Sequence, residues 1–275
     1  MSKLAPIGVF DSGFGGLTIL KKIVERMPGY DYVFLGDNAR APYGSRSFVT
    51  VYNYTLQAVK KLFELGCPLV VLACNTASAK ALRTIQQEYL AKEAPQHRVL
   101  GIIRPTAEAL GGITKTKKVG VLGTAGTVNS QSYILETAKL SPEIKIFQQA
   151  CPLLVPIVEN NEIDTPGADF FVEKYLSQLF AQDSEIDTIV LGCTHYPLLI
   201  NSFKKFLSPE IHIVKQNEIV AHSLQDYLLR HPDMDARLSK NSSIHYYTTD
   251  DSALFDLSAS VFMGKQVRSG SISLN

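Results

Sequence analysis

The amino-acid sequence predicts an α/β protein made of two similar doubly wound lobes, each built on a mainly parallel sheet. Short apolar runs alternate along the chain with longer stretches that suit helices. Several runs, such as "LVVLA" at 69–73, are apolar throughout, which is typical of parallel strands buried on both faces. In this fold class, ligands bind beyond the carboxyl ends of the strands. Functional residues are therefore expected where the apolar runs end.

The order of the elements follows from this alternation. The apolar runs predict strands at 7–10, 32–35, 69–73, 99–102, 118–122, 145–149, 188–191 and 211–214. The stretches between and after them predict helices at 17–27, 49–65, 77–92, 106–113, 130–138, 169–180, 198–206 and 218–229. Strand and helix thus alternate in the manner of a doubly wound sheet.

The chain also repeats itself loosely. "IGVFDSGFGG" at 7–16 opens the first half with a strand and a glycine-rich turn, and "VGVLGTAGTV" at 119–128 opens the second half in the same way. Each opening is followed by a later strand that ends in a cysteine, Cys74 in the first half and Cys193 in the second. We infer two halves of similar design with one thiol each.

Composition excludes several classes of protein. The 275 residues carry a net charge of +1 without a basic stripe, which argues against nucleic acid as a partner. The apolar runs are too short to span a membrane, and the first residues lack the pattern of a signal peptide. A cytoplasmic location is expected, where the four cysteines stay reduced. No Cys-x-x-Cys pair is present, so neither a metal nor a redox centre is expected.

Cys74 and Cys193 are the strongest candidates for chemistry. A lone cysteine is most often a small buried apolar residue, and that interpretation suits Cys67 and Cys151. Cys74 and Cys193 instead stand at strand ends, and polar residues able to cap a helix follow them directly. Backbone amides at a helix start favour a thiolate and also bind a substrate carboxylate.

Three further features have competing interpretations. Asp11 ends the first strand and is either an N-cap for the helix near Leu17 or a catalytic group, and the two roles are compatible. The loop at 35–47 is either part of a site or a long crossover turn. His195, two residues after Cys193, is better suited to proton transfer than to zinc, because no other Cys/His cluster exists in the sequence. Neither glycine-rich turn fits a dinucleotide or phosphate-binding motif.

Five stretches, taken in order, resemble the cofactor-independent glutamate racemases of the aspartate/glutamate racemase superfamily. They are "FDSGFGGL", "GDNARAPYG", "ACNTASA", "GTAGTVNSQSY" and "LGCTHYPLL". The resemblance spans nearly the whole chain and implies interconversion of L- and D-glutamate, without a cofactor, for peptidoglycan synthesis. It implies that Cys74 and Cys193 are acid–base thiols, assisted by Asp11, His195 and Glu159. The substrate contacts it implies are Ser12, Pro42, Tyr43, Gly44, Ser45, Asn75, Thr76, Thr124 and Thr194.

The resemblance also implies a division of the chain and a mode of association. A first lobe is expected from 1–100 plus 216–275, with the second lobe at 101–215 and the site in the cleft between them. The late helix and the "IHYYTT" segment would return to pack on the first lobe. Relatives commonly pair, so a homodimer is expected.

Two identical bases suit a racemase because a proton must leave one face of the α-carbon and another must return to the opposite face. An ordinary thiol pKa of about 8.5 would need only a modest shift for this work. The alternatives left open are a racemase for aspartate or another amino acid, a non-catalytic amino-acid-binding module, and a cysteine hydrolase that uses one thiol.

A few positions depart from the pattern of the family. Arg104 and Thr106 stand where relatives often have a different residue and a glycine, and Asp250 stands where glycine is frequent. The stretch 215–217 lacks a common Asp-Ser pair. None of these positions falls on the expected chemistry, so their consequences for packing and regulation stay open at this point.

Overall fold

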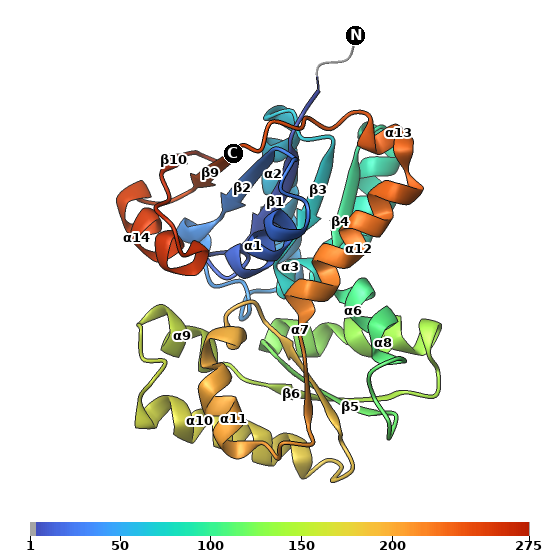
Figure 1. Ribbon diagram of the computed structural model, residues 1–275, viewed down its shortest axis with the longest axis vertical. Coiled ribbons are helices and arrows are strands. Elements are labelled where there is room, and N and C mark those ends of the chain that lie inside the picture. Colours follow the sequence, from blue (N-terminus) through green and yellow to red (C-terminus); the bar gives the residue numbers. More distant parts are fainter. Residues whose placement is uncertain (1–3, 275) are drawn as a thin grey trace.

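Two parallel sheets, one above the other, organise the chain. The computed structural model describes residues 4–274, and Figure 1 shows the larger sheet in the upper lobe and the smaller one in the lower lobe. Every strand pairing within each sheet is parallel. The predicted α/β class with two parallel-sheet lobes is confirmed.

The first sheet has six strands in the order β10–β9–β2–β1–β3–β4. Their bounds are β1 Ile7–Asp11, β2 Tyr32–Gly36, β3 Leu69–Leu72, β4 Arg98–Gly101, β9 Ile244–Thr248 and β10 Ser269–Ser271. The central strands β1, β2 and β3 are buried along their whole length. β9 pairs with β2 although it comes after all strands of the other sheet, so the end of the chain returns to the first lobe.

The second sheet has four strands in the order β6–β5–β7–β8. Their bounds are β5 Lys118–Gly123, β6 Lys145–Ala150, β7 Thr188–Gly192 and β8 His212–Val214. This order repeats the β2–β1–β3–β4 order of the first sheet. Cys74 comes shortly after β3 and Cys193 directly after β7, which are equivalent strands of the two sheets. The expected likeness of the two halves therefore extends to the placement of their thiols.

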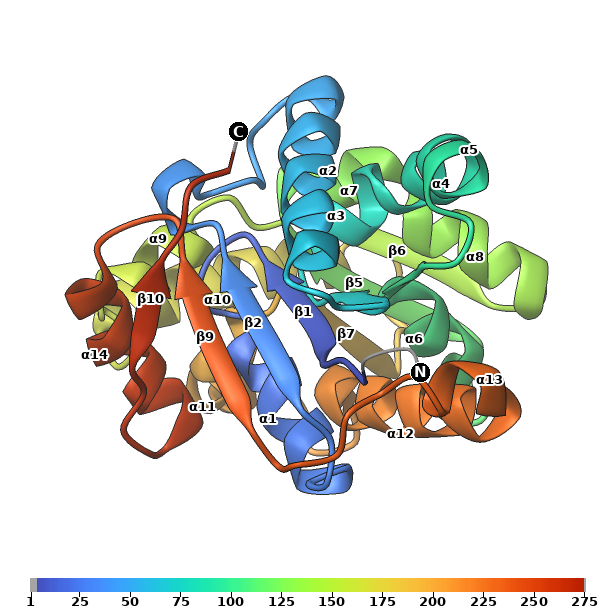
Figure 2. The same ribbon diagram turned by 90° about the horizontal axis from the view of Figure 1, so that it is seen from above.

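Helices cover both faces of each sheet. The helices before β4, or after β8, are α1 Leu17–Arg26, α2 Phe48–Glu64, α3 Asn75–Lys80, α4 Leu82–Thr84, α5 Ala91–Glu93, α12 Gln216–Arg230, α13 Pro232–Asp235 and α14 Ser252–Met263. Those between β4 and β8 are α6 Ile103–Leu110, α7 Ala125–Ser130, α8 Ser132–Leu140, α9 Leu154–Glu159, α10 Pro166–Phe180 and α11 Ile200–Phe206. In Figure 2, α2 and α3 lie on one side of the first sheet and α1 and α12 on the other. Separate apolar cores fill the two sides of this sheet.

The structure differs from the sequence expectation mainly in the helices. The helix expected at 77–92 begins at Asn75, breaks after Lys80 and includes a π-helical segment at Ile85–Leu90. The helix expected at 130–138 corresponds to α8, and the short helix α7 before it was not predicted. Gln131 between the two helices has a left-handed backbone (φ 54°). The short helices α9 and α13 lack the length over which helical periodicity is readable.

The carboxyl ends of both sheets face the same interlobe region, because residues after β1, β3, β5 and β7 line one cavity there. The Gly126 N–H of the second lobe donates a hydrogen bond to the Gly44 carbonyl of the first, at 2.8 Å. Ser132 Oγ donates to the Ala79 carbonyl at 3.0 Å across the same boundary. The loops after the parallel strands thus come together between the lobes.

Candidate active site

A small cavity lies where the two sets of strand ends meet. Its lining residues are Ser12, Ala41, Pro42, Tyr43, Gly44, Cys74, Asn75, Thr76, Thr124, Val155, Glu159, Cys193, Thr194 and His195. The cavity volume is about 20 Å³, little more than a single water molecule needs. Both candidate thiols line it, one from each lobe, and it gathers most of the residues that the sequence singled out. Asp11 and Ser45 are not among the lining residues.

Cys74 occupies the N-cap of α3, so the thiol itself caps the helix in place of the polar residues after it. Its Sγ accepts a hydrogen bond from the Ala77 N–H at 3.4 Å and lies 3.4 Å from Ser12 Oγ. The sulfur is nevertheless buried, and burial together with the negative charge of Asp11 raises the Cys74 pKa to about 12. Desolvation therefore outweighs the hydrogen bonds to the sulfur, and the Cys74 pKa moves away from neutrality instead of toward it.

Cys193 has a different partner. Its Sγ lies 3.9 Å from His195 Nδ1, and His195 Nε2 lies 3.2 Å from Glu159 Oε1. The histidine–glutamate contact has the distance of an ion pair without the angle of a hydrogen bond. Burial alone would lower the His195 pKa, but the contacts to Cys193 and Glu159 and the charge of Asp11 outweigh it and raise the pKa to about 10. The imidazole therefore holds its proton to a higher pH than an ordinary histidine.

Asp11 lies beneath the cavity rather than in its wall. Its carboxylate is fully buried, and Oδ2 accepts a hydrogen bond from the Gly13 N–H at 2.9 Å. Burial raises the Asp11 pKa, while the charge of His195 and the backbone N–H groups of Gly16 and Gly13 oppose that rise. The side chain is not the N-cap of α1, because Gly16 holds that position without a side-chain cap. Asp11 Oδ1 has no hydrogen-bond partner among the described residues.

The glycine-rich turn after Asp11 brings the first lobe into contact with the second. A Cβ atom added at Gly15 would lie 2.2 Å from Thr194 Oγ1 and 2.8 Å from His195 Nδ1. A Cβ atom at Gly16 would lie 2.5 Å from the Cβ of Asp11. Only glycine allows this approach, so the turn is shaped by contact with the opposite lobe.

The loop after β2 closes another side of the cavity. Tyr43 is buried and its hydroxyl donates to Asp37, which also pairs with Arg40 Nε at 2.7 Å. Lys80 Nζ donates to the Arg46 carbonyl at 2.7 Å and so ties the loop to α3. The predicted contacts Pro42, Tyr43 and Gly44 line the cavity, whereas Ser45 is exposed.

Hydroxyl groups from both lobes meet in the cavity wall. Thr76 Oγ1 lies 2.9 Å from Thr124 Oγ1, which is the N-cap of α7 and accepts from the Thr127 N–H at 3.2 Å. Thr194 and Ser12 add further hydroxyls. The wall thus presents small donors that suit a carboxylate.

Cys67 and Cys151 lie outside the cavity, in the interior of the protein. Cys67 and Cys151 are fully buried, and burial raises the pKa of both, to about 12 for Cys67. All four cysteines are free. Within residues 4–274, no group of three or more His, Cys, Asp or Glu side chains is placed to hold a metal ion. In that same part of the chain, no helix has the length and apolar character needed to cross a membrane.

Sequence reasoning missed some wall residues. Val155 reaches the cavity from α9, one turn before Glu159. Ala41, which precedes Pro42, also lines it. Neither residue type carries a chemical signal, and α9 itself was not predicted.

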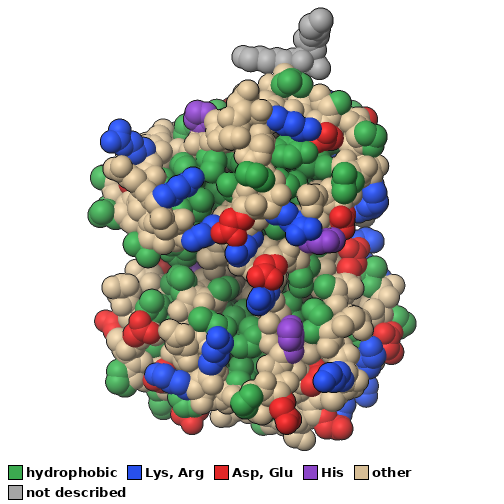
Figure 3. All heavy atoms as spheres, in the orientation of Figure 1, with side chains coloured by type: hydrophobic (Ala, Val, Ile, Leu, Met, Phe, Trp, Pro, Cys, Tyr) green, Lys and Arg blue, Asp and Glu red, His purple; other side chains and the backbone are tan. Residues whose placement is uncertain are grey.

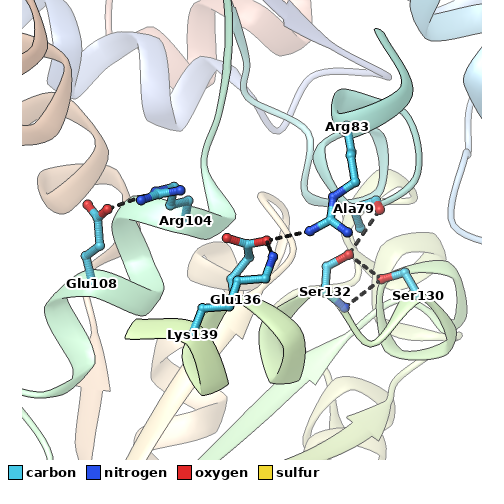
Figure 4. A network of polar contacts seen from close by, with 8 residues as sticks. All are labelled: Ala79, Arg83, Arg104, Glu108, Ser130, Ser132, Glu136 and Lys139. Atoms are coloured by element: carbon cyan, nitrogen blue, oxygen red, sulfur yellow. Dashed lines mark hydrogen bonds and ion pairs between the residues drawn. The ribbon is translucent and has the colours of Figure 1, made fainter. Parts of the chain in front are cut away.

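A separate, larger cleft of about 680 Å³ opens between the lobes on the side of α6, α8 and α12. Figure 3 shows side chains of both charges along the level where the lobes meet. In Figure 4, Arg83 pairs with Glu136 across the lobe boundary at 3.1 Å, and Lys139 also contacts Glu136, at 2.9 Å. The third pair drawn there, Arg104 with Glu108, lies within α6. Arg83 and Lys139 thus share one carboxylate, and the lining of the cleft carries more basic than acidic side chains.

Two parallel α/β lobes that each contribute one thiol to a shared cavity form the arrangement expected of a two-base amino-acid racemase. The chain belongs to the Asp/Glu/hydantoin racemase family, whose model matches residues 7–223.

Individual relatives agree with this family. The glutamate racemase of Sulfurihydrogenibium is 38% identical over 260 residues, which cover 94% of each chain. The crystal structure of glutamate racemase isoform RacE1 from Bacillus anthracis superposes with a TM-score of 0.89 at 35% identity, covering 98% of each chain. The structure of the Francisella tularensis glutamate racemase in complex with D-glutamate gives a TM-score of 0.87 at 31% identity, again over 98% of each chain.

Proposed function

We propose that this protein is a glutamate racemase that interconverts L- and D-glutamate without a cofactor and supplies D-glutamate for peptidoglycan. The observation that carries the proposal is the pairing of Cys74 and Cys193, which come from equivalent strand ends of two lobes and line one cavity. The glutamate racemases that resemble the chain over nearly its full length support the choice of substrate.

In the proposed reaction, one sulfur removes the proton from the α-carbon and the other returns a proton to the opposite face. The Cys193 sulfur lies 3.9 Å from His195 Nδ1, and we propose that Cys193 begins as the base. Cys74, with its raised pKa, begins as the acid. After one turnover the protons have exchanged places, and the site is ready for the other enantiomer.

The carbanion formed in this way needs stabilisation, because the proton beside a carboxylate is very weakly acidic. The hydroxyls of Thr76, Thr124 and Thr194 would donate to the substrate carboxylates and to the enediolate-like state. Ser12, Asn75 and the loop residues Pro42, Tyr43, Gly44 and Ser45 would complete the substrate contacts. A closed cavity excludes water, which strengthens every one of these interactions.

Each sulfur has a different set of charged neighbours. Glu159 keeps His195 charged and oriented beside Cys193. Asp11 is fully buried, and its charge favours the protonated form of Cys74, the form that donates to the α-carbon.

A cavity of about 20 Å³ does not hold glutamate, so the lobes or the loop after β2 must open for the substrate to bind. We propose that the moving units are a first lobe of 1–100 plus 216–275 and a second lobe of 101–215. The division of strands between the two sheets supports these limits.

Homodimerisation and a cytoplasmic location complete the proposal. Leu254, Leu257 and Val261 form an exposed apolar stripe along α14, with exposed fractions of 65–79%, that a second copy would cover. A light-scattering mass of one chain at micromolar concentration would contradict the dimer. The cytoplasm suits the chemistry because both site sulfurs must stay reduced.

The decisive experiment follows L-glutamate with the purified protein in D₂O and no added cofactor. Circular dichroism is expected to decay to zero while deuterium enters the α-carbon. Glutamate binding without exchange would indicate a binding module, and exchange with aspartate alone would indicate a different racemase. C74A and C193A are each expected to abolish racemisation, while the matched control C67A, far from the cavity, retains it.

A further inference from the structure

A closed ring of buried hydrogen bonds lies directly behind the cavity. It joins Asn75, the residue after Cys74, to Tyr133 on α8 and to Gln216, the first residue of α12. Thr106 on α6 is attached to the ring through Gln216. The exposed fractions of these four residues are 6% or less. Tyr133 ends the stretch "GTAGTVNSQSY" quoted for the family resemblance, but the sequence did not assign Tyr133, Thr106 or Gln216 to the site.

The ring runs in one direction. Asn75 Nδ2 donates to Gln216 Oε1 at 2.8 Å, Gln216 Nε2 donates to the Tyr133 hydroxyl at 2.8 Å, and the Tyr133 hydroxyl donates to Asn75 Oδ1 at 2.8 Å. The second Nε2 hydrogen of Gln216 goes to Thr106 Oγ1 at 2.9 Å, and Thr106 in turn donates to the Ile102 carbonyl at 2.7 Å.

This arrangement accounts for every donor of the three ring side chains except one. A side-chain amide nitrogen carries two hydrogens, and Asn75 uses one of them on Gln216. The Asn75 oxygen accepts from the Tyr133 hydroxyl, and Gln216 Nε2, whose two hydrogens go to Tyr133 and Thr106, lies 3.3 Å from it. Asn75 lines the cavity, and its second N–H is the one polar group of this side chain that is not already used within the ring.

The ring therefore decides which end of the Asn75 amide a substrate meets. With the ring intact, Asn75 offers a donor to an approaching carboxylate. A flipped amide would offer an acceptor instead, and it would leave buried polar groups of Tyr133 and Gln216 unpaired. Burial keeps the Tyr133 pKa above its ordinary value, so the hydroxyl that directs the ring stays protonated.

The ring also spans the places where the chain passes between the lobes. Thr106 follows β4, where the chain leaves the first sheet, and Gln216 follows β8, where the chain returns. Asn75 belongs to the first lobe beside Cys74, while Tyr133 packs under Gly192, next to Cys193. Two of the positions that depart from the family pattern, Thr106 and Gln216, thus contact each other in one network.

We propose that Tyr133 and Gln216 are positioning residues that hold the Asn75 amide with its free N–H toward a carboxylate of the substrate. This inference rests on the proposed function and adds to it a specific donor and the means by which that donor is oriented. Loss of the ring would weaken substrate binding more than it slows the proton transfers themselves.

The test is a double-mutant cycle that uses Y133F and N75A. Y133F removes only the hydroxyl that donates to Asn75, and it is expected to raise KM for both glutamate enantiomers about tenfold, with kcat changed less than threefold. In the N75A background, Y133F is expected to change KM less than twofold, because its partner is already gone. T137V on the same helix is the matched control, since Thr137 is buried and its hydroxyl has no partner among the described residues.

The outcomes separate the two proposals. If Y133F raises KM just as much in the N75A background, Tyr133 acts structurally and the proposed positioning role is overturned. A wild-type KM in Y133F would also overturn the proposal. If Y133F does not fold, Q216M replaces it in the same cycle. If the wild-type protein binds glutamate but does not racemise it, the proposed function fails. The role of the ring is then tested with the equilibrium dissociation constants for glutamate of the same variants.

Discussion

His195 Nε2 lies 3.2 Å from Glu159 Oε1 while its other ring nitrogen, Nδ1, lies 3.9 Å from the Cys193 sulfur. The imidazole is thus held between an acid and a thiol inside the protein. The same environment raises the His195 pKa from an ordinary 6.5 to about 10, despite burial, which acts in the opposite direction. Because the pKa is raised, the charge of His195 contributes to the stability of the folded protein over a defined range of pH.

The stability contributed by His195 depends on pH in a defined direction. The folded protein keeps the His195 proton at pH values where the unfolded chain has released it. Its contribution is therefore complete below about pH 6.5 and is lost as the pH rises toward 10. We expect the difference in free energy of unfolding between wild type and H195Q to shrink between pH 6.5 and 9.5 in urea titrations. The exposed histidine variant H222Q serves as control, and a difference that grows with pH would refute the assignment.

The protonation of Cys74 depends on Asp11. Burial, reinforced by the Asp11 charge, raises the Cys74 pKa, so D11N is expected to lower that pKa from about 12. Thiolate absorbance near 240 nm, followed from pH 8 to 11 in a C193A background, measures the change. D11N/C193A should form thiolate at lower pH than C193A alone, and a C74A/C193A protein gives the baseline. An unchanged titration would show that burial alone sets the pKa.

Gly15 is expected to be essential for activity and dispensable for folding. A Cβ atom at this position would overlap Thr194 Oγ1 at 2.2 Å and press on His195, so G15A should displace groups of the site. Displacements on the order of 1 Å cost about a hundredfold in rate, and we expect at least that loss in kcat/KM. G29A is the matched control, because no atom lies within 4 Å of its added methyl group. Equal activities of the two variants would contradict the close approach of the lobes.

Lys80 is expected to control substrate affinity through the loop after β2. Lys80 is 9% exposed, and its ammonium group donates a hydrogen bond to the Arg46 carbonyl. Burial lowers the Lys80 pKa. K80M keeps the apolar stem and loses the hydrogen bond, so KM for glutamate should rise about three- to tenfold. R83A, one turn along on the exposed lobe boundary in Figure 4, should alter KM and stability little, because surface ion pairs contribute about 0–1 kcal/mol. Steady-state kinetics of both variants measure these KM values. A larger rise in KM for R83A than for K80M would contradict the proposed role of Lys80.

Strands were more predictable than helices for a physical reason. Parallel strands buried on both faces appear as continuous apolar runs, so the runs ending near Asp11, Cys74 and Cys193 could be located directly. The short strand β10 carries no such run. The apolar run of α9 spans only a six-residue helix and contains Pro156, so it does not show helical periodicity. The break between α7 and α8 depends on one left-handed residue, Gln131. Local pattern does not report features that small.

The candidate site divides along the same line. Cys74, Cys193 and His195 were found because each follows a buried strand and has a side chain able to transfer protons. The N-cap role of Cys74, its raised pKa and the charge on His195 came from burial and from neighbours brought in by other elements. Charge state in a protein interior is set by surroundings that are distant in sequence.

The sequence by itself determined the class of fold, the two strand ends that carry thiols, and the family to which the chain belongs, because these depend on residue type and on order along the chain. Only the tertiary structure decided which side chains meet. Asn75 and Gln216, separated by 141 positions, share a hydrogen bond because both chain crossovers pass behind one cavity. Contacts of that kind arise when two sheets pack with their carboxyl ends together, and no local periodicity records them.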